Sequence, residues 1–282
     1  MNQAKRSFSR LTVFRICAAG VLALVLSPIA SAQTTSAPAQ TQADNEYQTG
    51  ATLWQQSSAE ARALQYQAYA LARLMLDRDL RSHSKSKLRR AVVVDVDETI
   101  LDNSRFQAGL IVNHAPFKPD EWVAWCNSAK ATAIPGALEF LKYATSRGVR
   151  VFYVTNREKP EKPGTMTNLK QLGFPGVSDE TVVVRTDVSS KEPRRRKISE
   201  QYRIVLLCGD NLNDFTNIFE GKTVEERNAA VDAARAKFGT QFIVLPNPTY
   251  GDWENAIYGY ARLDDQQKAA RRKAALKTPS ER

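Results

Sequence analysis

The sequence predicts an α/β fold in which helices cover both faces of a Rossmann-like parallel sheet, giving three layers. Short apolar runs rich in β-branched residues recur between residues 90 and 247 of the 282-residue chain. Continuous rather than alternating apolar runs are typical of strands that are buried on both faces. Stretches with a helical pattern lie between these runs, which is the order expected when crossover helices join parallel strands.

The expected elements follow in order along the chain. From Glu46 to about Leu80, apolar residues at spacings of three and four predict a helix. Further helices are expected over 135–148, which opens with Pro135 and ends at Gly148, and over 163–174. The predicted strands are 90–97, 149–157, 181–186, 203–210 and 241–247.

The first 32 residues have the pattern of a signal peptide. Four Lys and Arg residues precede an apolar run from Ile16 to Ala30, and Ala30-Ser31-Ala32 offers a cleavage site of small residues. An uncleaved membrane anchor is the alternative, but the apolar run is short for a bilayer span. We therefore expect a periplasmic or secreted protein without a stable membrane span, beginning with a flexible leader over 33–45.

Composition narrows the classes of function. Beyond residue 32 the chain has 36 Lys and Arg against 30 Asp and Glu, and the positive charge is scattered. No nucleic-acid polymer is expected as a partner, and the basic clusters at 191–197 and 268–277 are interpreted as solvated helix faces. With two histidines in the chain, a His-rich zinc site and a Ser-His-Asp triad are disfavoured. Cys126 and Cys208 leave open a disulfide or two separate thiols.

Chemically useful side chains emerge where the predicted strands end, which is where ligands bind in such sheets. They are Asp95 and Asp97, Thr155 and Asn156, and Asp210 and Asp214, with Lys191 after the strand at 181–186. Converging carboxylates repel one another unless a cation lies between them. Hard oxygen donors at Asp95, Asp97 and Asp210, without His or Cys nearby, predict Mg²⁺.

A carboxylate beside Mg²⁺ is suited to nucleophilic attack on a phosphoryl group. Asp95 is the expected nucleophile, and Asp97 the acid that protonates the leaving group and later activates water. Lys191, Thr155 and Asn156 are expected to bind the phosphate oxygens.

Four segments in order, "DVDET" (95–99), "VTNR" (154–157), Lys191 and "GDNLNDF" (209–215), resemble the haloacid dehalogenase superfamily of phosphatases. "VVDVDETILDNS" together with "VLLCGDNLNDF" looks like the paired signatures of the class C bacterial acid phosphatases, also called the lipoprotein acid phosphatase and 5′-nucleotidase family. The resemblance runs from about Glu46 to Tyr260. It implies a haloacid dehalogenase fold with a small, mainly helical cap.

The resemblance also implies roles for individual residues. Asp95 would be both nucleophile and metal ligand, Asp97 the acid/base that offers the metal its backbone carbonyl, and Asp210 a ligand supported by Asp214. The phosphate would be held by Thr155, Asn156 and Lys191. The implied organisation is an N-terminal helical segment (46–88), a phosphatase domain (89–260) with its cap at about 105–133, and a basic C-terminal tail (261–282).

Two features depart from the family pattern. The cleavage region "SPIASAQ" has no lipobox Cys, so lipid anchoring is not expected. Phe106 stands where the first signature often has Tyr, which removes a hydroxyl.

The expected substrate is a small phosphate monoester, with nucleoside monophosphates favoured. Trp122 in the cap stretch and Tyr250 after the last strand are the candidates for stacking on an aromatic leaving group. A phosphotransferase and a catalytically idle binding or storage protein are the alternatives, and homodimer formation is left open. Glu98 and Asp102 receive no role.

Overall fold

The computed structural model describes residues 45–82 and 86–279, all within one unit, Thr41–Arg282. The predicted signal peptide and the leader as far as residue 44 lie outside the described residues. In the described part no helix is long and apolar enough to cross a membrane.

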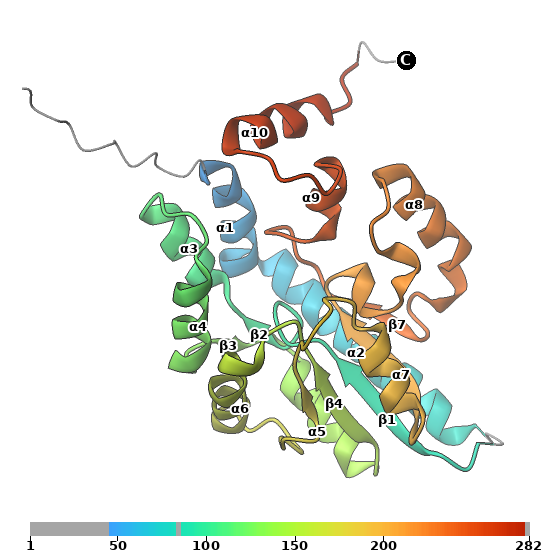
Figure 1. The fold of residues 1–282 in the computed structure, drawn as a ribbon. Coiled ribbons are helices and arrows are strands. Elements are labelled where there is room, and N and C mark those ends of the chain that lie inside the picture. Colours follow the sequence, from blue (N-terminus) through green and yellow to red (C-terminus); the bar gives the residue numbers. More distant parts are fainter. Residues whose placement is uncertain (1–44, 83–85, 280–282) are drawn as a thin grey trace, which may run out of the picture. The chain divides into compact units, whose positions relative to one another are not determined.

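A five-stranded parallel sheet has the order β5-β4-β1-β6-β7 (Figure 1). Its strands correspond to the five predicted apolar runs: β1 (Arg89–Val94), β4 (Arg150–Val154), β5 (Val182–Val183), β6 (Tyr202–Gly209) and β7 (Phe242–Val244). The predicted parallel α/β class is confirmed. A second, two-stranded antiparallel sheet, β2 (Leu101–Asp102) with β3 (Thr132–Ala133), was not predicted.

Helices and short 3-10 turns connect these strands. The α-helices are α1 (Thr49–Ser57), α2 (Ala59–Arg81), α3 (Ser104–Val112), α4 (Pro119–Ser128), α5 (Ala137–Ser146), α6 (Lys162–Gln171), α7 (Glu192–Ser199), α8 (Val224–Ala233), α9 (Asp252–Ile257) and α10 (Asp265–Ala274). The 3-10 turns are η1 (Glu46–Gln48), η2 (Lys159–Glu161), η3 (Leu212–Asp214), η4 (Asn217–Phe219) and η5 (Arg235–Lys237).

The helix predicted from Glu46 to about Leu80 is interrupted at Ser58. This residue is extended, and its Oγ accepts a hydrogen bond of 2.9 Å from the amide of Ala61. It therefore caps the N-terminus of α2, although the apolar spacing continues across it. Helices α3 and α4 lie in the stretch predicted as a cap.

The two faces of the sheet pack into separate apolar clusters. Val92 and Val94 of β1 pack in a cluster with residues of α2 and α5, whereas Ala91 and Val93 pack with Ile198 of α7. Side chains alternate between the faces of a strand, so both faces are covered and the sheet forms the middle of three layers. Cys126 and Cys208 are buried free thiols, so the disulfide alternative is not formed.

Candidate active site

Two adjacent strands deliver the first pair of carboxylates. Asp95 directly follows β1, and its amide donates a 2.9 Å hydrogen bond to the carbonyl of Cys208 in β6. Asp210 directly follows β6. Because β1 and β6 are parallel neighbours, both carboxylates emerge at the same edge of the sheet.

A tight turn returns a third carboxylate to this edge. The Oδ2 of Asp214 accepts from the amide of Asn211 at 3.0 Å, and the Oδ1 of Asn211 accepts from the amide of Asn213 at 3.2 Å. Asp214 then lies over Gly209, where an added Cβ would be 2.5 Å from the Asp214 Cβ. The glycine of "GDNLND" is required by this close approach.

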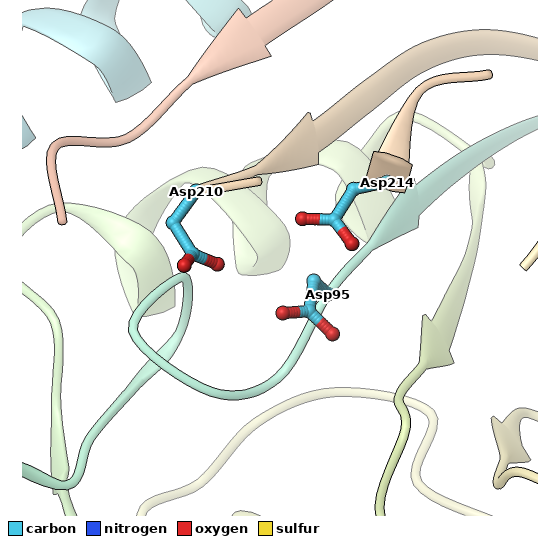
Figure 2. Close-up of side chains that lie close together, drawn as sticks. All are labelled: Asp95, Asp210 and Asp214. Carbon is cyan, nitrogen blue, oxygen red and sulfur yellow. The ribbon is translucent and has the colours of Figure 1, made fainter. Parts of the chain in front are cut away.

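Asp95, Asp210 and Asp214 form one cluster (Figure 2). Each offers a carboxylate oxygen, and these oxygens all lie within 4.8 Å of one another. Lys191 completes the group, since its Nζ donates to Asp95 Oδ1 and, at 2.6 Å, to Asp214 Oδ1. These four predicted site residues therefore lie together at one edge of the sheet, and the roles assigned to them stay predictions.

The cluster carries more negative charge than Lys191 balances. Burial raises the pKa of Asp95 well above its usual range, although Lys191 opposes the shift. Loss of contact with water, and then the neighbouring Asp214, raise the pKa of Asp210 to about 6. Burial lowers the pKa of Lys191, but Asp214 and Asp95 outweigh it, so the net shift is upward. Three converging carboxylate oxygen donors with excess negative charge fit a hard divalent cation.

The Asp97 carboxylate is not part of this cluster, because Arg157 holds it. Arg157 donates to Asp97 Oδ1 from Nη2 at 2.7 Å and from Nε at 3.0 Å. Asn103 Nδ2 donates to the same oxygen at 2.9 Å, and Thr155 Oγ1 donates to Oδ2 at 3.2 Å. The predicted contribution of the Asp97 backbone carbonyl to the metal stays a prediction.

Arg157 was not singled out from the sequence, although it immediately follows the polar pair at the end of β4. Its side chain is 1% exposed. Its Nη1 donates to Thr165 Oγ1 at 3.0 Å, and its guanidinium lies 5.5 Å from the ring centroid of Trp122. Asn103, which also contacts Arg157, is fixed by a 2.8 Å hydrogen bond from Trp125 Nε1. Helices α4 and α6 thus position the group that holds Asp97.

The turn after β1 contains a second unpredicted contact. Glu98 is buried with φ of 54°, an uncommon conformation for a residue other than glycine. Its carboxyl accepts from the amide of Asn103 at 2.9 Å and from the hydroxyl of Tyr250. Burial, and then Asp97, raise the pKa of Glu98 well above its usual range. Glu98, left without a role by the sequence, therefore ties the loop before α9 to the turn.

Asp210 is held by neutral donors. Thr99 Oγ1 donates to its Oδ1 at 3.0 Å, and Asn247 Nδ2 donates to its Oδ2 at 2.8 Å. The threonine of "DVDET" thereby connects the β1 turn to the end of β6.

A cavity of about 880 Å³ opens above the carboxylates. All but one of the predicted site residues line it: Asp95, Asp97, Trp122, Asn156, Lys191, Asp210, Asp214 and Tyr250. The exception is Thr155, which is fully buried and does not line the cavity. Its hydroxyl donates to Asp97 and accepts from the amide of Arg157 at 3.0 Å.

The basic cluster 191–197 is not simply a solvated face, so that interpretation was wrong in part. Arg195 is buried and donates to the carbonyl of Asp214 at 2.8 Å. Arg194 donates to the carbonyl of Thr155 and to Asn156 Oδ1, both at 2.6 Å. Both arginines lie on α7, directly after Lys191, so this helix supports two sides of the site.

Comparisons with known proteins find similar chains among the acid phosphatases. Residues 9–253 match the family model for the HAD superfamily, subfamily IIIB (acid phosphatase). Two structures of the class C acid phosphatase from Bacillus anthracis, one with tungstate bound, each match with a TM-score of 0.79 and 41% identity, covering 82% of this chain and 97% of that one. Acid phosphatase 1 of Solanum lycopersicum is 28% identical over 129 residues, 43% of this chain. That match spans half the length of the tomato protein.

Proposed function

Because the chain belongs to the acid phosphatases of HAD subfamily IIIB, and so to a family of phosphomonoesterases, we propose that it hydrolyses phosphate monoesters through an aspartyl-phosphate, with Mg²⁺ as cofactor. Nucleoside monophosphates are the proposed substrates, and the periplasm or the medium the proposed location. The observation that carries the proposal is the convergence of Asp95, Asp210, Asp214 and Lys191 at one sheet edge beneath the cavity.

Asp95 is the nucleophile in this proposal. Its carboxylate oxygen forms a bond to phosphorus as the ester oxygen leaves, and water then attacks the phosphorus of the aspartyl-phosphate to release orthophosphate. Lys191 contacts Asp95 and lines the cavity, so its charge reduces the repulsion between the carboxylate and the anionic ester.

The donors of the cluster fit Mg²⁺ because all are carboxylate oxygens, and Asp95, Asp210 and Asp214 would hold it. Bound there, the ion supplies positive charge for the phosphoryl oxygens. Asn247 and Thr99 orient Asp210, which keeps its carboxylate in place for this role.

Asp97 is the proposed acid/base. It lies two residues after Asp95 and also lines the cavity, and its side chain is 18% exposed. Its Oδ1 receives the short contacts from Arg157 and Asn103, whereas the contacts to Oδ2 are 3.2 and 3.3 Å. Oδ2 is therefore the oxygen proposed to give its proton to the leaving group and to accept one from water.

The size of the cavity supports a substrate larger than phosphate alone, since pockets of about 300–1,000 Å³ suit drug-sized ligands. Trp122 and Tyr250 both line it and are proposed to contact the leaving group. Tungstate, bound in one of the related structures, is a tetrahedral oxyanion like phosphate, which is consistent with an anion site in this fold.

The test is phosphate release from a panel of nucleoside monophosphates, aryl phosphates and alkyl phosphates, with Mg²⁺ or with EDTA. We expect turnover that requires the metal and is faster for nucleoside and aryl esters. Absence of turnover for every ester would favour the idle binding protein and overturn the proposal. An added alcohol acceptor, checked for a new phosphate ester, measures any phosphotransfer.

The raised pKa of Asp210 predicts a pH-dependent stabilisation by Mg²⁺. The pKa rises from 3.8 to about 6 in the folded protein. At a pH between these two values, Asp210 is therefore protonated in the folded protein and ionised in the unfolded chain. The contribution of Asp210 to the metal-free stability therefore falls as pH rises from about 4 to 6. Above pH 6 the carboxylate is free to bind metal.

We therefore expect Mg²⁺ to raise the Tm more at pH 7 than at pH 5, because protons compete with the ion. Thermal unfolding at both pH values, with Mg²⁺ or EDTA, measures the difference. Asp210→Asn is the matched variant and should show a small Mg²⁺ shift at either pH. Equal Mg²⁺ shifts of the wild-type protein at the two pH values would contradict the prediction.

A further inference from the structure

Helix α10 contributes to the wall of the cavity, although it lies beyond residues 9–253 that match the family model. Asp265, Lys268 and Arg272 line the cavity. Their spacing of three and four places them on one face of the helix. Arg271 and Lys273 are exposed and do not line the cavity. The basic C-terminal segment is therefore not solely a solvated tail.

Arg272 fixes α10 against both ends of the described chain. Its guanidinium lies 3.5 Å from the ring centroid of Tyr47 in η1. Its Nη1 donates to Tyr258 Oη at 2.8 Å and lies 3.9 Å from Glu254 Oε1. In Figure 1, α10 accordingly runs beside α9 and the start of α1. The helix is held by contacts rather than only tethered by the chain.

Lys268 differs from the other cations of the cavity. Arg157 pairs with Asp97, Lys191 with Asp95 and Asp214, and Arg272 with Glu254. Lys268 is the remaining lysine or arginine that lines the cavity. Within the described residues, the structure shows no side-chain partner for it. It is half-buried, and the acidic residue that shares its helix face is Asp265, one turn earlier.

The acidic residues of the outer cavity are engaged elsewhere. Glu254 accepts from Tyr258 Oη at 2.5 Å, Glu220 accepts from Ser190 Oγ at 2.7 Å, and Asp252 accepts from Asn255 Nδ2 at 3.0 Å. Asp265 lies on α10 itself, one turn before Lys268. An ammonium group has three donors and no acceptor, so its natural ligand is an anionic group.

We propose that Lys268 binds a second anionic group on the leaving group of the substrate, such as the second phosphate of a nucleoside bisphosphate. This role of Lys268 depends on the proposed function in one respect: the reacting phosphate is taken to bind at the Asp95 end of the cavity. Asp95 and the residues of α10 line the same cavity of about 880 Å³, a size that suits ligands larger than phosphate alone.

The role of Lys268 is tested by measuring ligand binding to the full-length chain that carries Asp95→Asn. This substitution prevents turnover and so keeps the ligand intact. The probes are a nucleoside 3′,5′-bisphosphate and the matching 5′-monophosphate, titrated by calorimetry with Mg²⁺ present. Adding Lys268→Ala should weaken bisphosphate binding about tenfold, as expected for the loss of one charge-assisted contact, and change monophosphate binding less than twofold. Lys268→Arg should restore most of the difference.

Arg271→Ala is the matched control, because it removes the same charge from the exposed side of the same helix. It should leave the ratio of the two Kd values unchanged. An equal loss for both ligands, or no loss for the bisphosphate, would overturn the role of Lys268. This experiment measures a Kd and does not depend on phosphate release. If the wild-type protein released no phosphate, the proposed function would be overturned instead.

Discussion

Replacing Asp95 with asparagine is expected to lower the rate of phosphate release by a factor of about 10⁴ or more, the scale seen when a nucleophile is removed. The amide has no charge and is a poor nucleophile, so the aspartyl-phosphate cannot form. The substitution is close to isosteric, and Lys191 keeps its contact with Asp214. We therefore expect the variant to fold, with a Tm near that of the wild-type protein.

Asp102→Asn is the matched control for this experiment. Asp102 lies in the same acidic segment, but its Oδ1 accepts a 2.8 Å hydrogen bond from the amide of Ser104 at the start of α3, and it does not line the cavity. The rate of phosphate release by Asp102→Asn should stay within a fewfold of the wild-type rate. Rapid quenching of wild-type turnover should place a phosphoryl group on the peptide that contains Asp95. Substantial turnover by Asp95→Asn would rule out the covalent mechanism.

The sheet was predictable because burial on both faces leaves a simple record in the sequence. Each predicted apolar run overlaps one strand, and the main errors lie at the ends. The run 90–97 ends as β1 at Val94. The amide of Asp95 still donates to β6, and the chain turns out of the sheet after it. The run 181–186 contracts to Val182–Val183, which pair with β4 on one side only as an edge strand.

The site was predictable to the extent that strand ends define it. Asp95 and Asp210 could be paired because parallel strands end at one edge, and their convergence is observed. Arg157 obeys the same rule and was overlooked, since the polar pair before it matched a phosphate-binding role. The contact between Glu98 and Tyr250 joins positions 152 residues apart, and no local pattern encodes such a pairing.

The contact between η1 and α10 was also beyond the sequence. The spacing of Lys268 and Arg272 predicts a shared helix face, but not what that face meets. The partner, Tyr47, lies more than 200 residues earlier. Periodicity reports burial, whereas the identity of the covering element depends on the whole fold.

Replacing Arg157 with lysine is expected to damage catalysis selectively. Lysine keeps the charge but not the planar fork, which donates to Asp97 from both Nε and Nη2 and once each to Asn103 and Thr165. The Asp97 carboxylate would lose its fixed orientation. A misplaced general acid harms esters with poor leaving groups most, because these depend on protonation in the transition state.

We therefore expect Arg157→Lys to slow release from an alkyl phosphate by about 10²-fold or more, a typical contribution of general acid catalysis, and from 4-nitrophenyl phosphate by much less. Arg157→Ala should also destabilise the fold, by about 3–5 kcal/mol, because it leaves one partner of a buried pair alone. Lysine therefore isolates the catalytic effect, and thermal unfolding of both variants measures the structural one.

Arg185→Lys is the matched control, because it makes the same substitution in an ion pair at the surface. Arg185 pairs with Glu158, and both side chains are about one third or more exposed, so a small effect on stability and rate is expected. If Arg157→Lys slowed both classes of ester equally, Arg157 would be a structural residue without a specific link to Asp97. A selective loss with poor leaving groups requires that link, since general damage to the fold or to phosphate binding does not depend on the basicity of the departing oxygen.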